Sequence, residues 1–179
     1  NDMLNISKFE QDKVFFNIQQ VDLCDLIKEI VTSFEIKVNG KNIYLKFDES
    51  CSDAFVDVDK EKMRDVLMNL IDNAIKFTNQ GGIDVGIQID LDKVTVSIKD
   101  SGSGISQEDL PKLFHKFGRI DNSYTIASDT GGTGLGLYIA KLYIEGMGGK
   151  VWATSEGTSK GSTFWVSIPK SKINTRTPD

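Results

Sequence analysis

The clearest pattern in the chain is a helical repeat of apolar residues over residues 60–77. Apolar side chains recur there at the spacing of three and four residues that places them on one face of a helix. They are Met63, Val66, Leu67, Leu70, Ile71, Ala74 and Ile75. Asp59 precedes the repeat and belongs to the residue types that cap helix N-termini. The pattern predicts a helix over 60–77 with one buried face.

Two later segments alternate strictly between apolar and polar residues, at 83–89 and at 94–98, with 90–93 between them. Such alternation is typical of strands with one buried face, and the short connection predicts a β-hairpin. Other short apolar runs predict further strands, over residues 14–21, 43–47, 55–58, 151–154 and 163–168.

Three more segments have helical patterns. We predict a helix over 23–37, capped by Asp22 and closed by Asn39-Gly40, a short helical stretch over 106–117 and a helix over 133–147. Residues 118–132 have no periodicity and predict a loop. The sum is an α+β two-layer sandwich, a mixed β-sheet packed on one face by about three helices.

The length of 179 residues fits one domain. We assign that domain to residues 14–169, with 1–13 as an appendage that suits the end of a truncated helix and 170–179 as a frayed tail. Because the first residue is Asn, we expect the chain to be an excised piece of a longer protein.

Composition excludes several classes of protein. The net charge of −5 argues against binding nucleic acid by charge alone. The apolar runs are far shorter than the roughly 18–20 residues that cross a bilayer, and no signal peptide is visible, so we expect a soluble, cytoplasmic domain. Cys24 and Cys51 lack metal-site spacing and are expected to be reduced thiols. A single histidine, His115, argues against a histidine-based zinc site.

The polar face of the helix at 60–77 carries an unusual combination. Each residue turns a helix by about 100°. With the angle of Asn69 around the helix axis set at zero, Asn73 lies at about 40° and Lys76 at about −20°, opposite the apolar residues. Asn is costly inside a helix, so two stacked Asn residues suggest a function. Amide oxygens can ligate Mg²⁺ while Lys76 faces a phosphate. A plain solvated face is the alternative.

Two glycine-rich segments are further candidates. Asp100-Ser101-Gly102-Ser103-Gly104 follows a predicted strand, so its backbone could approach a flat ligand and its carboxylate could accept from an amino group, although a simple acidic turn fits equally well. Residues 131–137 lead into a predicted helix, where free N–H groups suit phosphate. Leu137 stands where a Walker A loop requires Lys, so a different phosphate site is implied.

The order of these features resembles the catalytic, ATP-binding domain of sensor histidine kinases, in the gyrase, histidine kinase and MutL superfamily with its Bergerat-type fold. The resemblance covers about residues 14–169. Residues 67–77 resemble the N box, 100–104 the G1 box, 113–117 the F box and 132–137 the G2 box, while 161–164 resemble a further glycine turn. Residues 4–13 resemble the end of the second helix of a dimerisation domain.

The resemblance implies roles for individual residues. Asn73 would bind Mg²⁺ and Asp100 would accept from the adenine amino group. Catalysis would rest on Asn69, Asn73, Lys76 and Arg119, the last reaching the γ-phosphate. The implied ATP-binding set is Asn69, Asn73, Lys76, Phe77, Asp100, Gly102, Gly104, Ile105, Lys116, Gly132, Thr133, Gly134, Leu135, Gly136, Leu137 and Thr163.

The implied activity is transfer of the γ-phosphoryl group of ATP to a histidine on the chain's own or a partner subunit's dimerisation domain, and onward to a response regulator. The resemblance implies a homodimeric parent and allows that parent to be anchored in a membrane. Position 69 is Asn where hydrolases of this fold carry a Glu that activates water, which disfavours an ATP hydrolase. A serine kinase of the same fold and a non-catalytic interaction module are less favoured hypotheses. His115 lies in the F box and is followed by Lys116, so we do not expect it to be the acceptor.

Overall fold

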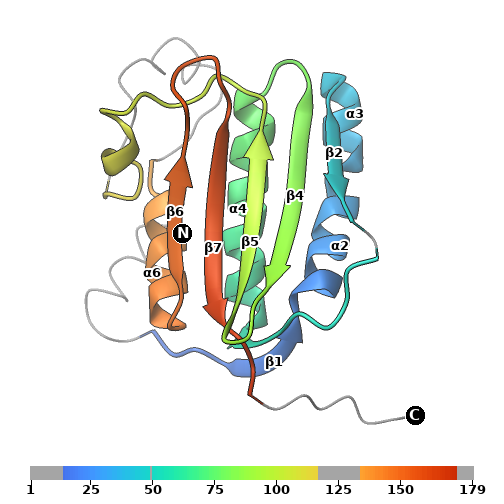
Figure 1. Cartoon of the computed structure of the whole chain (residues 1–179), viewed down its shortest axis with the longest axis vertical. Coiled ribbons are helices and arrows are strands. Elements are labelled where there is room, and N and C mark those ends of the chain that lie inside the picture. Colours follow the sequence, from blue (N-terminus) through green and yellow to red (C-terminus); the bar gives the residue numbers. More distant parts are fainter. Residues whose placement is uncertain (1–13, 49, 117–133, 173–179) are drawn as a thin grey trace.

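The computed structural model describes residues 14–48, 50–116 and 134–172. The chain forms a sheet with its main helices on one face (Figure 1). In chain order the elements are β1 Ile18–Asp22, α2 Leu23–Ser33, α3 Glu35–Lys41, β2 Tyr44–Phe47, β3 Phe55–Asp59, α4 Lys60–Phe77, β4 Gly82–Ile89, β5 Lys93–Asp100, the 3₁₀ turn η1 Leu110–Lys112, α6 Gly136–Gly146, β6 Lys150–Thr154 and β7 Ser162–Pro169.

The main sheet has five strands in the order β2-β4-β5-β7-β6, and β1 pairs separately with β3. The β2–β4 pair is parallel and the other pairs of the main sheet are antiparallel, so the sheet is mixed. Helices α2, α4 and α6 lie side by side behind this sheet in Figure 1. The predicted α+β two-layer sandwich is confirmed.

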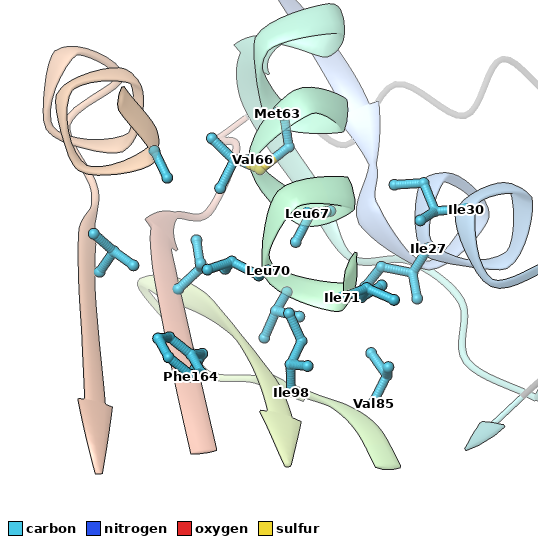
Figure 2. Packing of buried hydrophobic residues seen from close by; sticks show 14 of the residues in the cluster. Ile27, Ile30, Met63, Val66, Leu67, Leu70, Ile71, Val85, Ile98 and Phe164 are labelled. Carbon is cyan, nitrogen blue, oxygen red and sulfur yellow. The ribbon is translucent and has the colours of Figure 1, made fainter. Parts of the chain in front are cut away.

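Helix α4 is the centre of the core. Figure 2 shows its apolar side chains directed toward the strands of the sheet, as for Leu70, and toward the neighbouring helix α2, where Ile71 lies beside Ile27. Leu67 and Leu70 are fully buried, as are Ile27 of α2 and Ile98 of β5. Burying each such side chain contributes about 1.5–3 kcal/mol before opposing terms are counted. Helix α4 is therefore held along its apolar face, which fixes the direction of its polar face.

The predicted helix over 23–37 is divided into α2 and α3. Phe34 separates them, with its side chain buried and its backbone at φ −94° and ψ −3°. The hydroxyl of Ser33 donates to the carbonyl of Ile30 at 2.6 Å, a local bond that competes with helix continuation. Helix α3 also runs past the predicted end at Asn39-Gly40, because Asn42 takes the left-handed conformation that ends it.

Two other predicted helices are shorter than expected. In the stretch over 106–117 only the 3₁₀ turn η1 forms among the described residues, since Pro111 supplies no N–H to a helix. The hydroxyl of Ser106 does accept from the N–H of Asp109 at 3.2 Å, as a cap would. Helix α6 begins at Gly136, so Gly134 and Leu135, which were predicted to be helical, precede it, while the predicted start at Thr133 lies outside the described residues.

The prediction of two reduced thiols is wrong, because a disulfide joins Cys24 to Cys51 with 5.6 Å between their Cα atoms. The two cysteines are brought together by contacts between segments that are distant in the sequence. Pairing of β1 with β3 brings the connection before β3 back to the start of α2, where the N–H of Leu23 donates to the carbonyl of Ala54. Nothing in the local sequence around either cysteine reveals this approach.

The structure describes only part of the segments predicted to lie outside the regular elements. Residues 1–13, predicted to be an appendage, and the predicted loop over 118–132 lie outside the described residues. The predicted tail begins with attached residues, since Lys170 forms a bridge with Val56 and the hydroxyl of Ser171 donates to Asp57 at 3.0 Å.

Within the part of the chain that the structure describes, no helix is both long and apolar enough to cross a membrane.

Candidate functional site

Asp100, the last residue of β5, has a buried carboxylate with a defined set of donors. It is only 5% exposed, and its Oδ1 accepts from the N–H of Gly102 at 2.8 Å and from the N–H of Ser162 at 3.3 Å. Its Oδ2 accepts from the hydroxyl of Ser162 at 2.5 Å. A carboxylate has about four lone-pair directions, so it can accept one further hydrogen bond from a ligand amino group.

Sequence reasoning missed Ser162 and chose its neighbour Thr163. Along β7, Phe164 and Val166 are buried and face the helices, and Ser162 shares their side of the strand. Thr163 lies on the opposite side with Trp165, away from the carboxylate of Asp100. The structure therefore does not bring Thr163 to the other candidates. The alternation of Phe164, Val166 and Ile168 could have identified Ser162, because residues two apart share a face.

The segment 100–105, which we call the Asp100 turn, depends on its glycines. A Cβ on Gly102 would overlap the carbonyl oxygen of Phe77, and one on Gly104 would overlap the carbonyl oxygen of Gly157. Gly104 also has φ +65°, which side-chain-bearing residues rarely adopt. The N–H of Ser103 donates to the carbonyl of Phe77 at 3.2 Å, so the turn is bonded directly to the end of α4.

The polar stripe, which consists of Asn69, Asn73 and Lys76, runs along α4 as predicted. All three are half-buried. The amide Nδ2 of Asn69 is buried and has no hydrogen-bond partner within the described part of the chain. A Cβ built on Gly136 would lie 2.6 Å from Oδ1 of Asn69, so the start of α6 packs directly against this amide. The fold thus brings the polar stripe to the glycine-rich segment.

These residues fit a magnesium–phosphate group. An amide donor buried without a partner costs about 1–3 kcal/mol, a cost that a phosphate oxygen accepting from Asn69 would remove. Asn73 supplies a neutral amide oxygen, and Mg²⁺ prefers oxygen ligands while keeping waters and phosphates of its own. The donor set is therefore suited to Mg²⁺ bound together with phosphate.

Both ends of α4 are secured by side chains. At its C-terminus, Nζ of Lys41 donates to the carbonyls of Ile75 at 2.7 Å, Lys76 at 3.2 Å and Thr78 at 3.0 Å. A cation there also complements the negative end of the helix dipole. Sequence reasoning did not find Lys41, because its partners are main-chain groups far along the chain. Nearby, Nζ of Lys76 lies 6.0 Å from the ring centre of Phe77, which is 37% exposed.

At the N-terminus of α4, Oδ1 of Asp59 accepts from the N–H of Lys62 at 3.1 Å and Oδ2 accepts from the N–H of Asn17 at 2.9 Å. Burial acts to raise the pKa of Asp59, but these hydrogen bonds to the charged form outweigh it, so the pKa lies below its ordinary value. The predicted cap is confirmed. It holds the helix that carries the polar stripe.

The glycine-rich segment is described from Gly134 onward. Gly134 has φ +71°, Leu135 is buried, and Gly136 and Leu137 are half-buried at the start of α6. No side chain of the described residues caps this helix. Ile105 is buried beside the Asp100 turn, whereas Lys116 is exposed. The remaining candidates, Arg119, Gly132 and Thr133, lie outside the described residues.

Comparison with known proteins gives a family and several relatives. Residues 58–172 match the family described as histidine kinase-, DNA gyrase B- and HSP90-like ATPases. The chain is 36% identical over 177 residues to the sensor histidine kinase WalK of Bacillus subtilis, covering 94% of this chain and 28% of WalK. It is 33% identical over 185 residues to the sensor protein GacS of Pseudomonas syringae, covering 96% of this chain and 20% of GacS.

Solved structures are similar over most of the chain. The catalytic domain of histidine kinase ThkA superposes with a TM-score of 0.74 at 34% identity, covering 86% of this chain and 96% of that one. Full-length ShkA in complex with AMPPNP gives a TM-score of 0.81 at 26% identity, covering 94% of this chain and 34% of ShkA. The chain thus spans nearly all of an isolated catalytic domain but less than a third of the length of the curated relatives above.

Proposed function

The chain belongs to the histidine kinase-, DNA gyrase B- and HSP90-like ATPase family as a catalytic ATP-binding domain of the sensor histidine kinase type, and on this premise we propose its reaction and its site residues. The domain binds ATP with Mg²⁺ and donates the γ-phosphoryl group to a histidine on a dimerisation domain. That domain belongs to the same chain or to a partner subunit of a homodimeric parent.

The observation that carries this proposal is the buried carboxylate of Asp100 beside a turn that admits no Cβ at Gly102. The carboxylate accepts from the exocyclic amino group of adenine, and the bare backbone of Gly102 and Gly104 lets the flat base lie close. Guanine presents a carbonyl oxygen in place of this amino group and would be repelled by the carboxylate. The site therefore prefers ATP to GTP.

The polar stripe receives the phosphates. Asn69 donates its unpartnered amide N–H to a phosphate oxygen, Asn73 offers its amide oxygen to the metal, and Lys76 neutralises phosphate charge. Gly136 packs against Asn69, and we expect the N–H groups of Gly134 and Gly136 to bind phosphate together with Gly132, Thr133 and Arg119. When bound, Mg²⁺ supplies charge neutralisation between the phosphate oxygens.

In the transfer step, a nitrogen of the acceptor histidine forms a bond to the γ-phosphorus while the bond from that phosphorus to the β–γ bridging oxygen breaks, and ADP leaves. The domain contributes positioning and charge stabilisation, because this chemistry needs little covalent work from a protein. Asn69 cannot act as a general base, so water is a poor competitor for the γ-phosphoryl group. An ATP hydrolase or serine kinase of the same fold is the alternative function.

The partners follow from this reaction. The phosphorylated histidine passes its phosphoryl group to a response regulator, and the ThkA structure in complex with the response regulator protein TrrA, with a TM-score of 0.72 to this chain at 29% identity, supports a partner of that type. His115 is exposed and is not the acceptor, so the isolated domain does not phosphorylate itself there. We place the domain in the cytoplasm, where ATP is available.

Calorimetric titration with Mg²⁺–ATP and with Mg²⁺–GTP tests this function. We expect ATP to bind, and we expect both GTP binding to the unaltered domain and ATP binding to Asp100→Asn to be at least about 30-fold weaker, since a misplaced hydrogen-bond group at a buried site costs about 2 kcal/mol or more. Asp92→Asn, in the exposed β4–β5 connection, is the control and should bind as the unaltered domain does. Equal affinity for ATP and GTP would contradict the proposal.

A further inference from the structure

The connection between β6 and β7, residues 155–161, lies directly against the Asp100 turn. The N–H of Ser159 donates to the carbonyl of Ser103 at 2.6 Å, and the N–H of Gly161 donates to the carbonyl of Gly102 at 3.2 Å. Gly104 fits only because it has no Cβ to meet Gly157. The two segments are 50 residues or more apart along the chain, yet their backbones form one unit.

One hydroxyl bonds to both segments. Oγ of Ser155 accepts from the N–H of Ile105 at 3.0 Å and from the N–H of Gly157 at 3.2 Å, and it donates to the carbonyl of Gly161 at 2.7 Å. A hydroxyl has one donor and two acceptor positions, so Ser155 is fully used. Its main chain takes part too, since Nε2 of Gln107 donates to the carbonyl of Ser155 at 2.8 Å.

We propose that Ser155 is a positioning residue of the nucleotide site. Its hydroxyl fixes the Asp100 turn through the hydrogen bonds to Ile105 and to the β6–β7 connection. This inference rests on the proposed function. Ser155 touches neither Asp100 nor the polar stripe through any hydrogen bond of the described residues. It acts by holding the backbone of Gly102–Ile105 at the distance from Phe77 and from the carboxylate that a flat base requires.

Loss of the Ser155 hydroxyl should move the turn because several main-chain groups form hydrogen bonds with this one oxygen. Without the hydroxyl, the N–H of Ile105, the N–H of Gly157 and the carbonyl of Gly161 lose a partner together. These groups are partly buried, and main-chain groups shielded from water rarely stay unpaired, so the turn and the connection shift to find other partners or water. Because Gly102 and Gly104 fit against neighbouring backbone with no room to spare, a shift of the turn changes the pocket itself.

The test compares Ser155→Ala with Ser155→Thr, which retains the hydroxyl, and with Ser167→Ala on the open face of β7 as the control. We expect Ser155→Ala to weaken Mg²⁺–ATP and adenosine by the same factor, about 5- to 20-fold, as the loss of one or two hydrogen bonds implies. Ser155→Thr should recover most of this loss, and Ser167→Ala should match the unaltered domain. Titrations are made well below the melting temperature of every variant.

A second readout needs no nucleotide. Amide hydrogen exchange at Ile105 and Gly157 should accelerate in Ser155→Ala and return in Ser155→Thr, because their N–H groups donate to the hydroxyl. Unchanged affinity in Ser155→Ala, or a loss confined to thermal stability, would overturn the positioning role. Failure of the unaltered domain to bind ATP would instead overturn the proposed function, while the exchange rates would still decide whether Ser155 holds the turn.

Discussion

The Asp100 turn and the polar stripe are the two ends of the nucleotide site that we propose, and their hydrogen bonding differs. In the turn, the carboxylate of Asp100 has donors from Gly102 and Ser162, and its neighbours are bonded to Phe77 and Ser155. On the stripe, the buried amide nitrogen of Asn69 has no partner among the described residues. At the Asp100 turn the protein itself supplies the hydrogen bonds, whereas on the polar stripe the amide nitrogen of Asn69 lacks an acceptor among the described residues.

This difference indicates how the free energy of nucleotide binding is divided between the Asp100 turn and the polar stripe. A turn fixed by main-chain hydrogen bonds is preorganised, so in the proposed site an adenine base would meet little reorganisation cost and Asp100 would set the selectivity. An unpaired donor at Asn69 lowers the stability of the free domain and gains a partner only when a phosphate arrives. We therefore expect changes in the turn to affect every adenine ligand and changes on the stripe to affect only phosphorylated ones.

Gly102→Ala should have the largest effect. A Cβ there overlaps the carbonyl of Phe77, so the turn must move and binding of both adenosine and Mg²⁺–ATP should fall by about 100-fold or more. Gly40→Ala is the matched control, because a Cβ on Gly40 meets nothing within 4 Å. Calorimetry on both variants measures the effect. Near-normal affinity in Gly102→Ala would show that the turn is adaptable and would remove the contrast.

Asn69→Ala should separate the two ends. We expect Mg²⁺–ATP to bind about 10-fold more weakly while adenosine binds unchanged, since only a phosphate contact is lost. The melting temperature should stay the same or rise, because Ala favours helices and the buried unpaired donor is gone. Met68→Ala, on the adjacent and 37% exposed position of α4, is the control. Equal losses for adenosine and Mg²⁺–ATP would contradict the division.

Lys41→Met should have an intermediate effect on both ends. Lys41 donates to three carbonyls at the end of α4, next to Lys76 and to the carbonyl of Phe77 that receives the Asp100 turn. Its loss should weaken Mg²⁺–ATP by about 3- to 10-fold. Lys28→Met removes a comparable bond, from Nζ to the carbonyl of Cys51, away from the site, and should leave binding intact. Identical affinities in the two variants would refute this role.

The smallest effect on binding should come from Asp59→Ala, which acts on stability. Because the folded pKa of Asp59 lies below its ordinary value, its charged form stabilises the domain above about pH 4, and this stabilisation is lost as the pH falls through the folded pKa. Denaturation at pH 7 should show a loss of about 1 kcal/mol, as for other caps, with little change in ATP affinity. A difference between the two proteins that persists undiminished at pH 2.5 would contradict the assignment.

The sequence predicted the fold where local pattern and tertiary packing agree. Helix α4 has the predicted bounds of 60–77, and the hairpin of β4 and β5 forms where alternation indicated. Prediction failed where distant contacts decide. Phe34 is drawn into the core and ends α2 early, and the pairing of β1 with β3 brings Cys24 to Cys51. Neither effect has a local signature.

For the candidate site, residue types and spacing placed Asn69 and Asn73 on the polar face of α4 and Asp100 just after a strand, and the structure has Asp100 as the last residue of β5. The sequence could not predict the hydrogen-bond partners of these side chains. That Ser162 bonds Asp100, that Lys41 bonds the end of α4 and that Asn69 has an unpaired nitrogen all follow from contacts between elements far apart in the chain.

The most direct test of the contrast is an NMR titration of the domain, first with adenosine and then with Mg²⁺–ATP, following the backbone amides of Gly102 and Ile105 and the side-chain amide of Asn69. We predict that adenosine shifts the two backbone amides and leaves Asn69 unchanged, and that Mg²⁺–ATP additionally shifts the Asn69 side-chain signal. A side-chain signal of Asn69 that moves with adenosine, or that does not respond to Mg²⁺–ATP, would contradict the account.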